Sequence, residues 1–208
     1  MDQMCYDFLQ EFFKLHDIKR KKVLEIGSLL IDGQERLNLR NLMDSSNTFI
    51  GLDMREGPGV DVVANSHELP FDDREFDVII NFNTLEHDDD PFKSMKEMKR
   101  CLKIEGGVLL TATPCYFYIH DYPSDYFRYT NEGVKLLGRD FVFKEVVCYG
   151  HPYFPQEIFG IFSNRKLEMN METFVNNYSK EILPKIHMDL RNFLRYIMVD
   201  MTKKVFRG

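Results

Sequence analysis

A short buried strand that runs into a glycine is the feature that most constrains the fold of this chain. Residues 22–34 read K-V-L-E-I-G-S-L-L-I-D-G-Q, and Val23, Leu24 and Ile26 are apolar enough for one buried strand that ends at Gly27. A glycine after a strand lets the backbone approach a ligand, and a helix start beyond it offers unpaired N–H groups. We therefore expect an open α/β sheet in which a helix restarts after this turn.

Two features of the same segment narrow the class of ligand. Its glycines, Gly27 and Gly33, do not have the G-x-G-x-x-G spacing, which argues against a pyrophosphate-binding dinucleotide site and leaves room for a nucleoside without phosphates. Glu25 lies inside the apolar strand, where a carboxylate is costly unless it has a partner. A nicotinamide-dependent oxidoreductase is therefore a disfavoured alternative.

Apolar runs and amphipathic segments alternate along the rest of the chain. The apolar runs are continuous, as expected for parallel strands that are covered on both faces. Alternation of strand and helix predicts a doubly wound parallel sheet rather than a barrel or a bundle. Beyond the first strand at 22–27, we expect strands at 48–53, 60–64, 76–82, 108–113, 141–149 and 158–162, and helices at 4–16, 34–43 (weak), 91–103 and 130–137.

Polar residues follow three of the expected strands. Asp53 ends the second strand, where a carboxylate can accept hydrogen bonds from two ribose hydroxyls, although capping of the next turn is the alternative reading. Asn65 follows the third strand and offers a donor and an acceptor, which suits the edge of an adenine. Asn81 lies at the end of the fourth strand. These side chains should meet at one edge of the sheet.

The segment 115–130, which reads C-Y-F-Y-I-H-D-Y-P-S-D-Y-F-R-Y-T, interrupts the alternating pattern. It is too polar for a core helix and too aromatic for a plain linker. It follows the fifth strand, so it belongs at the same edge as Asp53 and Asn81. We expect it to be a loop that forms a wall of the substrate pocket.

Charge and cysteine content exclude several functions. The net charge of -6 and the pI of about 5.6 argue against a broad nucleic-acid-binding surface, so no nucleic-acid partner is expected. The four cysteines form no C-x-x-C pair, which predicts reduced thiols in a cytoplasmic protein. The N-terminus does not resemble a signal peptide, and no apolar stretch is long enough to span a membrane.

The last part of the chain differs from the rest. Residues 165–208 carry more Lys and Arg than Asp and Glu, and their apolar residues suggest one or two amphipathic helices. These helices could pack on the same domain, pair with a second copy to form a homodimer, or touch an anionic surface. We therefore divide the chain into a ligand-binding domain at 1–164 and a C-terminal helical extension at 165–208.

Several motifs in this order resemble the class I S-adenosylmethionine-dependent methyltransferases. The resemblance covers about residues 20–150. It rests on V-L-E-I-G at 23–27, G-L-D-M at 51–54, N-S-H-E-L-P-F at 65–71, F-D-V-I-I at 76–80, L-E-H at 85–87 with Asp90-Pro91, K-R-C-L-K-I-E-G-G at 99–107 and H-D-Y-P-S-D-Y-F-R-Y-T at 120–130. It implies a Rossmann-like, mostly parallel sheet of seven strands whose last strand is antiparallel.

The resemblance also implies a cofactor site for S-adenosylmethionine, which leaves as S-adenosylhomocysteine. Glu25, Gly27 and Ser28 would lie at the methionine end, Asp53 would hold the ribose, Met54 would lie against the adenine, Asn65 and Ser66 would meet the adenine edge, and Asn81 and Phe82 would line the methionine side. Two departures weaken single contacts: the glycine turn lacks the commoner G-x-G, and Asn65 replaces the commoner aspartate.

The implied reaction is methyl transfer to an oxygen or nitrogen of a small molecule, such as a sugar or another metabolite. His120 and Asp121 are the candidate bases, and His87, Tyr122, Tyr126 and Arg128 are candidate residues of the acceptor pocket. Arg128 would suit an acidic acceptor such as a carboxylate or phosphate, but it could equally pair with Asp125. The cluster at 86–90 could suggest a metal site, but a helix start with its acids in solvent explains the aspartates at 88–90 more simply, so no metal is expected. The alternative is a non-catalytic domain that binds the cofactor or a partner protein.

Overall fold

The computed structural model describes residues 3–16, 18–31, 33, 35–120, 124–151 and 154–167. Asp121, Tyr122 and almost all of the expected C-terminal extension lie outside the described residues, so the proposed division at 164 and the proposed homodimer remain predictions. Among the described helices, none is both long and apolar enough to cross a bilayer.

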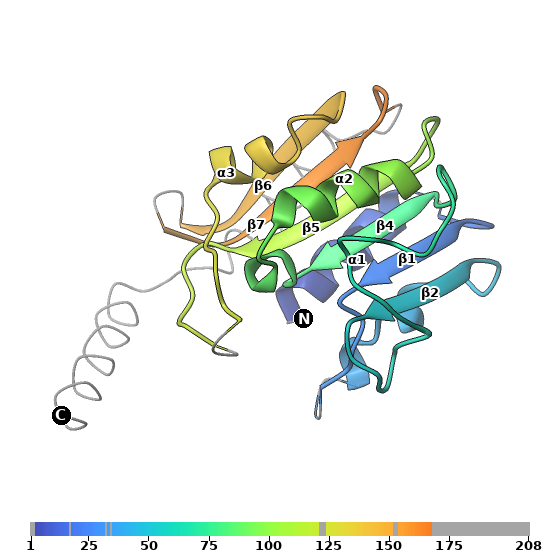
Figure 1. Ribbon diagram of the computed structural model, residues 1–208, viewed down its shortest axis with the longest axis horizontal. Helices are drawn as coiled ribbons and strands as arrows, with labels where there is room; N and C mark the ends of the chain where they lie inside the picture. The colour runs from blue at the N-terminus through green and yellow to red at the C-terminus, as the bar shows by residue number, and fades with distance from the viewer. Residues whose placement is uncertain are drawn as a thin grey trace, which may run out of the picture.

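The described strands form one seven-stranded sheet in the order β3-β2-β1-β4-β5-β7-β6 (Figure 1). Strands β1 to β5 pair with one another in parallel, and β7 runs antiparallel to both β5 and β6. The predicted doubly wound sheet with an antiparallel last strand is therefore confirmed. The strands are β1 Lys22–Ile26, β2 Thr48–Asp53, β3 Val62–Val63, β4 Val78–Phe82, β5 Val108–Pro114, β6 Phe143–His151 and β7 Phe154–Ser163.

Helices cover both faces of this sheet. Helix α1 (Gln3–Leu15) lies on one face, whereas α2 (Pro91–Cys101) and α3 (Asn131–Leu137) lie on the other (Figure 1). Side chains of successive strand residues therefore enter different cores. Val23 packs with Phe8 beneath α1, and Leu24 packs with Met98 beneath α2. Two buried faces explain why the strands read as continuous apolar runs.

The α-helix expected to restart after the turn at Gly27 is absent from the described part of the chain between β1 and β2, and this expectation was wrong. Ser28 N–H donates to the Leu52 carbonyl (3.1 Å), and Leu30 N–H donates to the Pro58 carbonyl (2.9 Å). These hydrogen bonds hold residues 28–30 against β2 and the loop after it, in a conformation that is not helical. The weak helix expected at 34–43 consists of two short 3-10 helices, η1 (Glu35–Leu37) and η2 (Leu39–Leu42).

Helix α2 begins as its sequence predicts. Asp90 is the N-cap residue, its carboxylate accepts from Lys93 N–H (3.2 Å), and Pro91 occupies the first turn. Asp88 contradicts the expectation that all the acids of this segment lie in solvent, because it is only 9% exposed. Its oxygens accept hydrogen bonds from Asp90 N–H and from the Ser94 hydroxyl. Capping and loop anchoring, rather than solvation, explain this acid.

Candidate functional site

The carboxyl ends of β1, β2, β4 and β5 meet at one edge of the sheet, where the polar residues predicted from the sequence gather. The 3-10 helix η3 (Leu85–His87) follows β4 at this edge. Thr84 joins it to β1, because its hydroxyl donates to the Ile26 carbonyl (3.3 Å). The loop after β5 descends beside η3 at the same edge (Figure 1). This edge is therefore the candidate site.

The turn after β1 is fixed against β2. Gly27 has a φ of +84°, a conformation that glycine adopts without strain. Gly27 N–H donates to the Leu52 carbonyl (2.8 Å), and Leu29 N–H donates to the Asp53 carboxylate (3.3 Å). A side chain at Gly27 would collide with Thr84, because an ideal Cβ would lie 2.1 Å from the Thr84 hydroxyl oxygen. Both the backbone conformation and the contact require glycine here.

We expect Gly27→Ala to destabilise the protein by about 2–4 kcal/mol, because a strained φ and a steric collision add. The measurement is chemical unfolding followed by circular dichroism. Gly33→Ala is the matched control: Gly33 has a φ of +86°, but a Cβ added there would meet nothing within 4 Å. It should cost about 1–2 kcal/mol from the backbone alone. Equal losses in the two variants would contradict a collision with Thr84.

Asp53 is positioned to accept further hydrogen bonds at the end of β2. Its side chain is only 10% exposed, and its two oxygens accept from Leu29 N–H and from Arg55 N–H (2.9 Å). A carboxylate has about four acceptor sites, so two remain for the hydroxyls of a ribose. The sequence-based alternative, capping of the next turn, is also present in the Arg55 N–H contact. The two roles are compatible.

Glu25 is the charged residue inside β1, and its side chain lies on the α1 face of the sheet. Desolvation raises the pKa of this carboxyl to about 8, although the charge of Arg40 in η2 opposes the rise. Burial makes the ionised form of this carboxyl costly, and a positively charged ligand group beside it would offset that cost. The ammonium of a methionine moiety is such a group, so this environment fits the predicted role of Glu25.

The Glu25 pKa predicts how stability depends on pH. The folded pKa of about 8 exceeds the unfolded value, so the folded state binds more protons between about pH 5 and pH 8. Wild-type stability should therefore fall as the pH rises through this window, and Glu25→Gln should flatten that part of the curve. Thermal unfolding at a series of pH values measures both. A variant that keeps the wild-type slope would assign the linkage to another group.

Two buried polar groups at this edge have no hydrogen-bond partner among the described residues. The Ser28 hydroxyl is one, and both side-chain atoms of Asn81 are unsatisfied although Asn81 is fully buried. Unsatisfied buried groups are costly, so a native protein usually gives them a partner. Together with Glu25 and Asp53, they fit a polar nucleoside that also carries an ammonium and a carboxylate.

The other predicted cofactor residues have more varied surroundings. Met54 is 67% exposed beside Asp53, where its side chain can lie against a flat base. Asn65 is exposed, and its side-chain oxygen accepts from His67 N–H (2.8 Å), so it also stabilises its own turn. Phe82 is different, because its ring packs against Phe8 and Phe159 beneath α1. Only the backbone of Phe82 is available to a cofactor.

The loop that carries Asn65 is anchored to the start of α2. His67 Nε2 lies 2.6 Å from the Asp88 carboxylate, and the Ser66 hydroxyl lies 2.8 Å from that of Ser94. Ser94 in turn hydrogen bonds to Asp88. These contacts fix the position of Ser66 at the edge of the sheet. The sequence analysis missed Ser94 and Asp88 as positioning residues, since Ser94 lies in a helix that reads as ordinary and Asp88 lies in the acidic segment just before it.

The loop after β5, described at residues 115–120 and 124–130 and called the aromatic loop below, is bound to η3 through backbone N–H groups. Tyr126 N–H and Phe127 N–H both donate to the Glu86 carbonyl (2.8 and 3.2 Å), and the Tyr129 hydroxyl donates to the Leu85 carbonyl (2.9 Å). The loop therefore occupies the predicted place beside the strand ends. The Tyr126 side chain itself is 51% exposed.

Arg128 is engaged within the aromatic loop. Its guanidinium donates to both oxygens of Asp125 (2.5 and 2.7 Å) and to the carbonyls of Phe117 and Tyr118. This pairing lowers the pKa of Asp125 well below its usual range. The suggestion that Arg128 binds an acidic acceptor therefore loses support, because most of its donors are taken. Arg128 instead stabilises the conformation of the aromatic loop.

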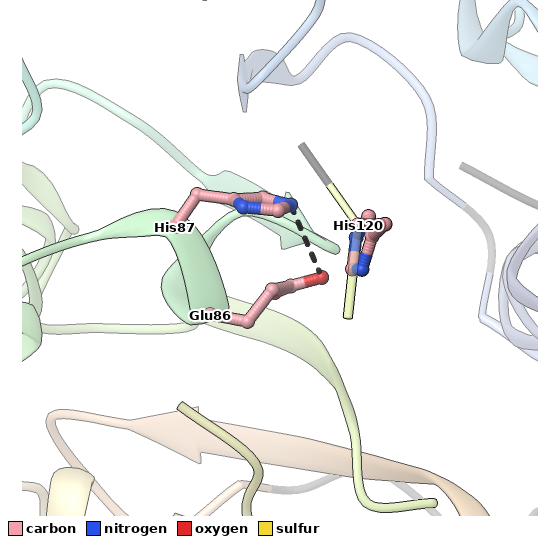
Figure 2. A group of neighbouring side chains, drawn as sticks. All are labelled: Glu86, His87 and His120. Atoms are coloured by element: carbon pink, nitrogen blue, oxygen red, sulfur yellow. Dashed lines mark ion pairs between the residues drawn. The ribbon is translucent and has the colours of Figure 1, made fainter. Parts of the chain in front are cut away.

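His87 and His120 come together with Glu86 between η3 and the loop (Figure 2). The rings of the two histidines are in edge contact, with centroids 4.7 Å apart. Glu86 Oε1 lies 3.9 Å from His87 Nε2, and the Glu86 side chain is 1% exposed. Burial raises the pKa of Glu86 to about 7. The sequence placed both histidines in the site but did not assign Glu86 a role.

Comparison with known proteins agrees with this geometry. Residues 38–110 match the family model described as a methyltransferase domain. The matched residues make up less than half of the chain, so the match shows a resemblance to this family. The resemblance drawn from the sequence is thereby confirmed; it implies S-adenosylmethionine as the cofactor and supports methyl transfer in general as the activity. No curated protein sequence matches the chain.

Solved structures of methyltransferases share the fold. A putative methyltransferase from Haloferax volcanii, in complex with the Trm112 activator, has a TM-score of 0.60 and 15% identity, over 79% of this chain and 92% of that chain. An Aquifex aeolicus S-adenosylmethionine-dependent methyltransferase has a TM-score of 0.55 and 15% identity, over 76% of this chain and 91% of that chain. A Thermotoga maritima methyltransferase, described as a possible histamine N-methyltransferase, has 0.54 and 18%, over 79% and 100%.

Proposed function

We propose that this methyltransferase domain transfers the methyl group to an oxygen or nitrogen of a small molecule, such as a sugar or another metabolite. The observation that carries the proposal is the loop at 116–120 and 124–128, which brings aromatic rings and His120 next to His87 at the strand ends. Such a wall offers apolar contact and a few polar groups, as small-molecule pockets do. The net charge of -6 argues against a nucleic-acid acceptor.

The cofactor would lie across the ends of β1, β2 and β4. In this proposal Glu25, Gly27, Ser28 and Asn81 hold its methionine part, with the Phe82 backbone beside them. Asp53 holds the ribose and Met54 covers the base, whose edge meets Asn65 and Ser66. When bound, S-adenosylmethionine supplies a sulfonium methyl group with a neutral thioether as the leaving group.

The residues of the pocket have mainly to align the acceptor and exclude water. Alignment alone can contribute about 7–11 kcal/mol to lowering the barrier. The acceptor oxygen or nitrogen forms a bond to the methyl carbon, the carbon–sulfur bond breaks, and the acceptor proton leaves. His120 is the proposed group at that proton, with Asp121 beside it in sequence; His87, Tyr122 and Tyr126 are proposed to shape the pocket, and Arg128 to support it.

Calorimetric titration of the full chain with S-adenosylmethionine and, separately, NAD tests the cofactor assignment. We expect micromolar binding of the methyl donor and none of NAD. A screen of sugars and amines, read as S-adenosylhomocysteine formed, then tests the acceptor class. Methyl-donor binding without turnover on any small molecule, but with turnover on a protein substrate, would contradict the proposal.

A non-catalytic domain is the second candidate. The observation that favours it is the row of exposed apolar residues Phe117, Tyr118 and Ile119, which are 48%, 61% and 76% exposed. Such residues can also contact a partner protein, and the Haloferax volcanii neighbour is itself in complex with an activator. The buried, unsatisfied Ser28 and Asn81 speak for a retained cofactor in either case.

A further inference from the structure

We propose that Glu86, His87 and His120 bind a divalent first-row transition-metal ion such as Zn²⁺ at the acceptor side of the site. No metal was expected from the sequence, because the acids that follow Glu86 read as a helix start. The fold changes this interpretation, since the aromatic loop brings His120 from a distant part of the chain to the side of η3.

The geometry of the three side chains suits such an ion. One ligand atom from each lies within 4.8 Å of the others, and the side chains point toward one another (Figure 2). Ligand atoms around a tetrahedral Zn²⁺ are about 3.3 Å apart, given metal–ligand bonds of about 2.0–2.1 Å. The 3.9 Å between Glu86 Oε1 and His87 Nε2 is close to this value. Two imidazoles and one carboxylate also leave coordination positions open for a substrate.

The hydrogen bonding of Glu86 is a second and independent observation. Both of its carboxylate oxygens are buried, and neither has a hydrogen-bond partner among the described residues. A buried carboxylate without such partners is costly, and proteins normally pair it or use it as a metal ligand. The Glu86 side chain is directed at the two imidazoles, so a cation placed between the three groups would satisfy it (Figure 2).

The two imidazoles are also held in the orientation that metal ligands need. His87 Nδ1 lies 2.5 Å from the Ser124 carbonyl oxygen. A carbonyl can only accept, so Nδ1 carries a proton, and Nε2 is the nitrogen through which His87 can bind an ion. His120 Nδ1 lies 3.3 Å from the Tyr118 carbonyl and 3.4 Å from the Asp125 carboxylate. Carbonyl and carboxylate partners of this kind orient the histidine ligands of known metal sites.

A second group of similar composition shows why hydrogen bonding matters. His67, Asp88 and Asp89 also have ligand atoms within 4.8 Å of one another. However, Asp88 already accepts from Asp90 N–H and from Ser94, and it contacts His67 at 2.6 Å. Its oxygens are satisfied without an ion, so this group carries no metal proposal and provides a control.

An ion at Glu86, His87 and His120 would have a role in the reaction, and this role rests on the proposed function. A divalent cation that binds an acceptor hydroxyl lowers the pKa of that hydroxyl and fixes its oxygen. The oxygen then forms its bond to the methyl carbon as the carbon–sulfur bond breaks, and the hydroxyl proton passes to solvent. With the ion bound, His120 therefore acts as a ligand instead of accepting the proton itself. The ion undergoes no change in oxidation state.

Titration of the full chain with Co²⁺, followed by visible absorption, tests the site without any methyl acceptor. Co²⁺ reports its own coordination, and Zn²⁺ and Mg²⁺ are added as competitors. We expect one Co²⁺ bound per chain, displacement by Zn²⁺ and no displacement by Mg²⁺, which prefers oxygen ligands. Glu86→Gln, His87→Gln and His120→Gln should each weaken binding by at least about tenfold. His67→Gln should bind as the wild type does.

The outcomes separate the metal proposal from the proposed function. Three results would overturn the proposed metal site: no Co²⁺ binding by the wild type, wild-type affinity in the Glu86, His87 and His120 variants, or loss of binding in His67→Gln. A sulfur-to-metal charge-transfer band would place the ion on cysteines and overturn it too. Circular dichroism of each variant shows whether it is folded, and Glu86→Gln preserves side-chain shape. A failed acceptor screen with intact Co²⁺ binding would instead contradict only the proposed acceptor class.

Discussion

Replacing Asp53 by asparagine is expected to weaken binding of S-adenosylmethionine about 100-fold. The Asp53 side chain at the end of β2 is 10% exposed, and its carboxylate retains acceptor sites beyond the two backbone N–H groups that it binds. Hydrogen bonds to a charged group contribute about 1.5–3 kcal/mol each, and asparagine keeps only one acceptor atom. A loss of about 2.7 kcal/mol corresponds to a factor of 100 in Kd. Calorimetric titration measures it directly.

Asp61→Asn is the matched control for this variant. Asp61 also accepts a backbone N–H of β2, since its carboxylate binds Gly51 N–H at 2.7 Å, and it pairs with Arg40. It is not among the residues proposed to contact the cofactor. We expect it to lower the unfolding temperature without a large change in Kd. If Asp61→Asn weakened binding as much as Asp53→Asn, the effect would come from β2 rather than from the ribose contact.

The sheet could be predicted from the sequence because its cause is local. Each central strand is a run of β-branched and aliphatic residues, and both faces of the sheet are covered, so the burial signal is continuous. The strand ends were less certain: β3 is limited to Val62–Val63, and β7 begins at Phe154, before the expected start at Ile158. Strand ends depend on cross-strand partners, which a single segment does not contain.

The turn after β1 shows where local reasoning fails. Leu29, Leu30 and Ile31 are compatible with a helix, and a helix is the usual continuation. The backbone instead bonds to β2 and to the loop after it, through Ser28 and Leu30. These partners are more than twenty residues away in sequence. A contact of this kind overrides the weak intrinsic preference of a short apolar segment.

The site divides in the same way. Residues at strand ends, such as Gly27, Asp53 and Asn81, could be placed from their position relative to a strand. Glu86 could not, because an acid in a run of acids reads as solvent-exposed, whereas the fold buries it under the aromatic loop. The role of Arg128 was left open between an acceptor contact and a pair with Asp125. The loop conformation decides for Asp125.

Replacing Arg128 by glutamine should destabilise the aromatic loop by about 3–5 kcal/mol, because it leaves the buried Asp125 carboxylate without its charged partner. The Asp125 side chain is 1% exposed, and the same guanidinium also binds the carbonyls of Phe117 and Tyr118. We expect loss of amide hydrogen-exchange protection at Tyr126 and Phe127, whose N–H groups bind the Glu86 carbonyl. The unfolding temperature should fall by several degrees.

Two further variants show whether the buried charge is the cause. Arg165→Gln removes an exposed pair with Glu105, whose side chains are 63% and 71% exposed, and should change stability by less than about 1 kcal/mol. Arg128→Gln combined with Asp125→Asn should recover part of the loss, because the unpaired charge is gone. If the double variant were less stable than Arg128→Gln alone, the bonds from Arg128 to the loop carbonyls, rather than the ion pair, would hold the wall.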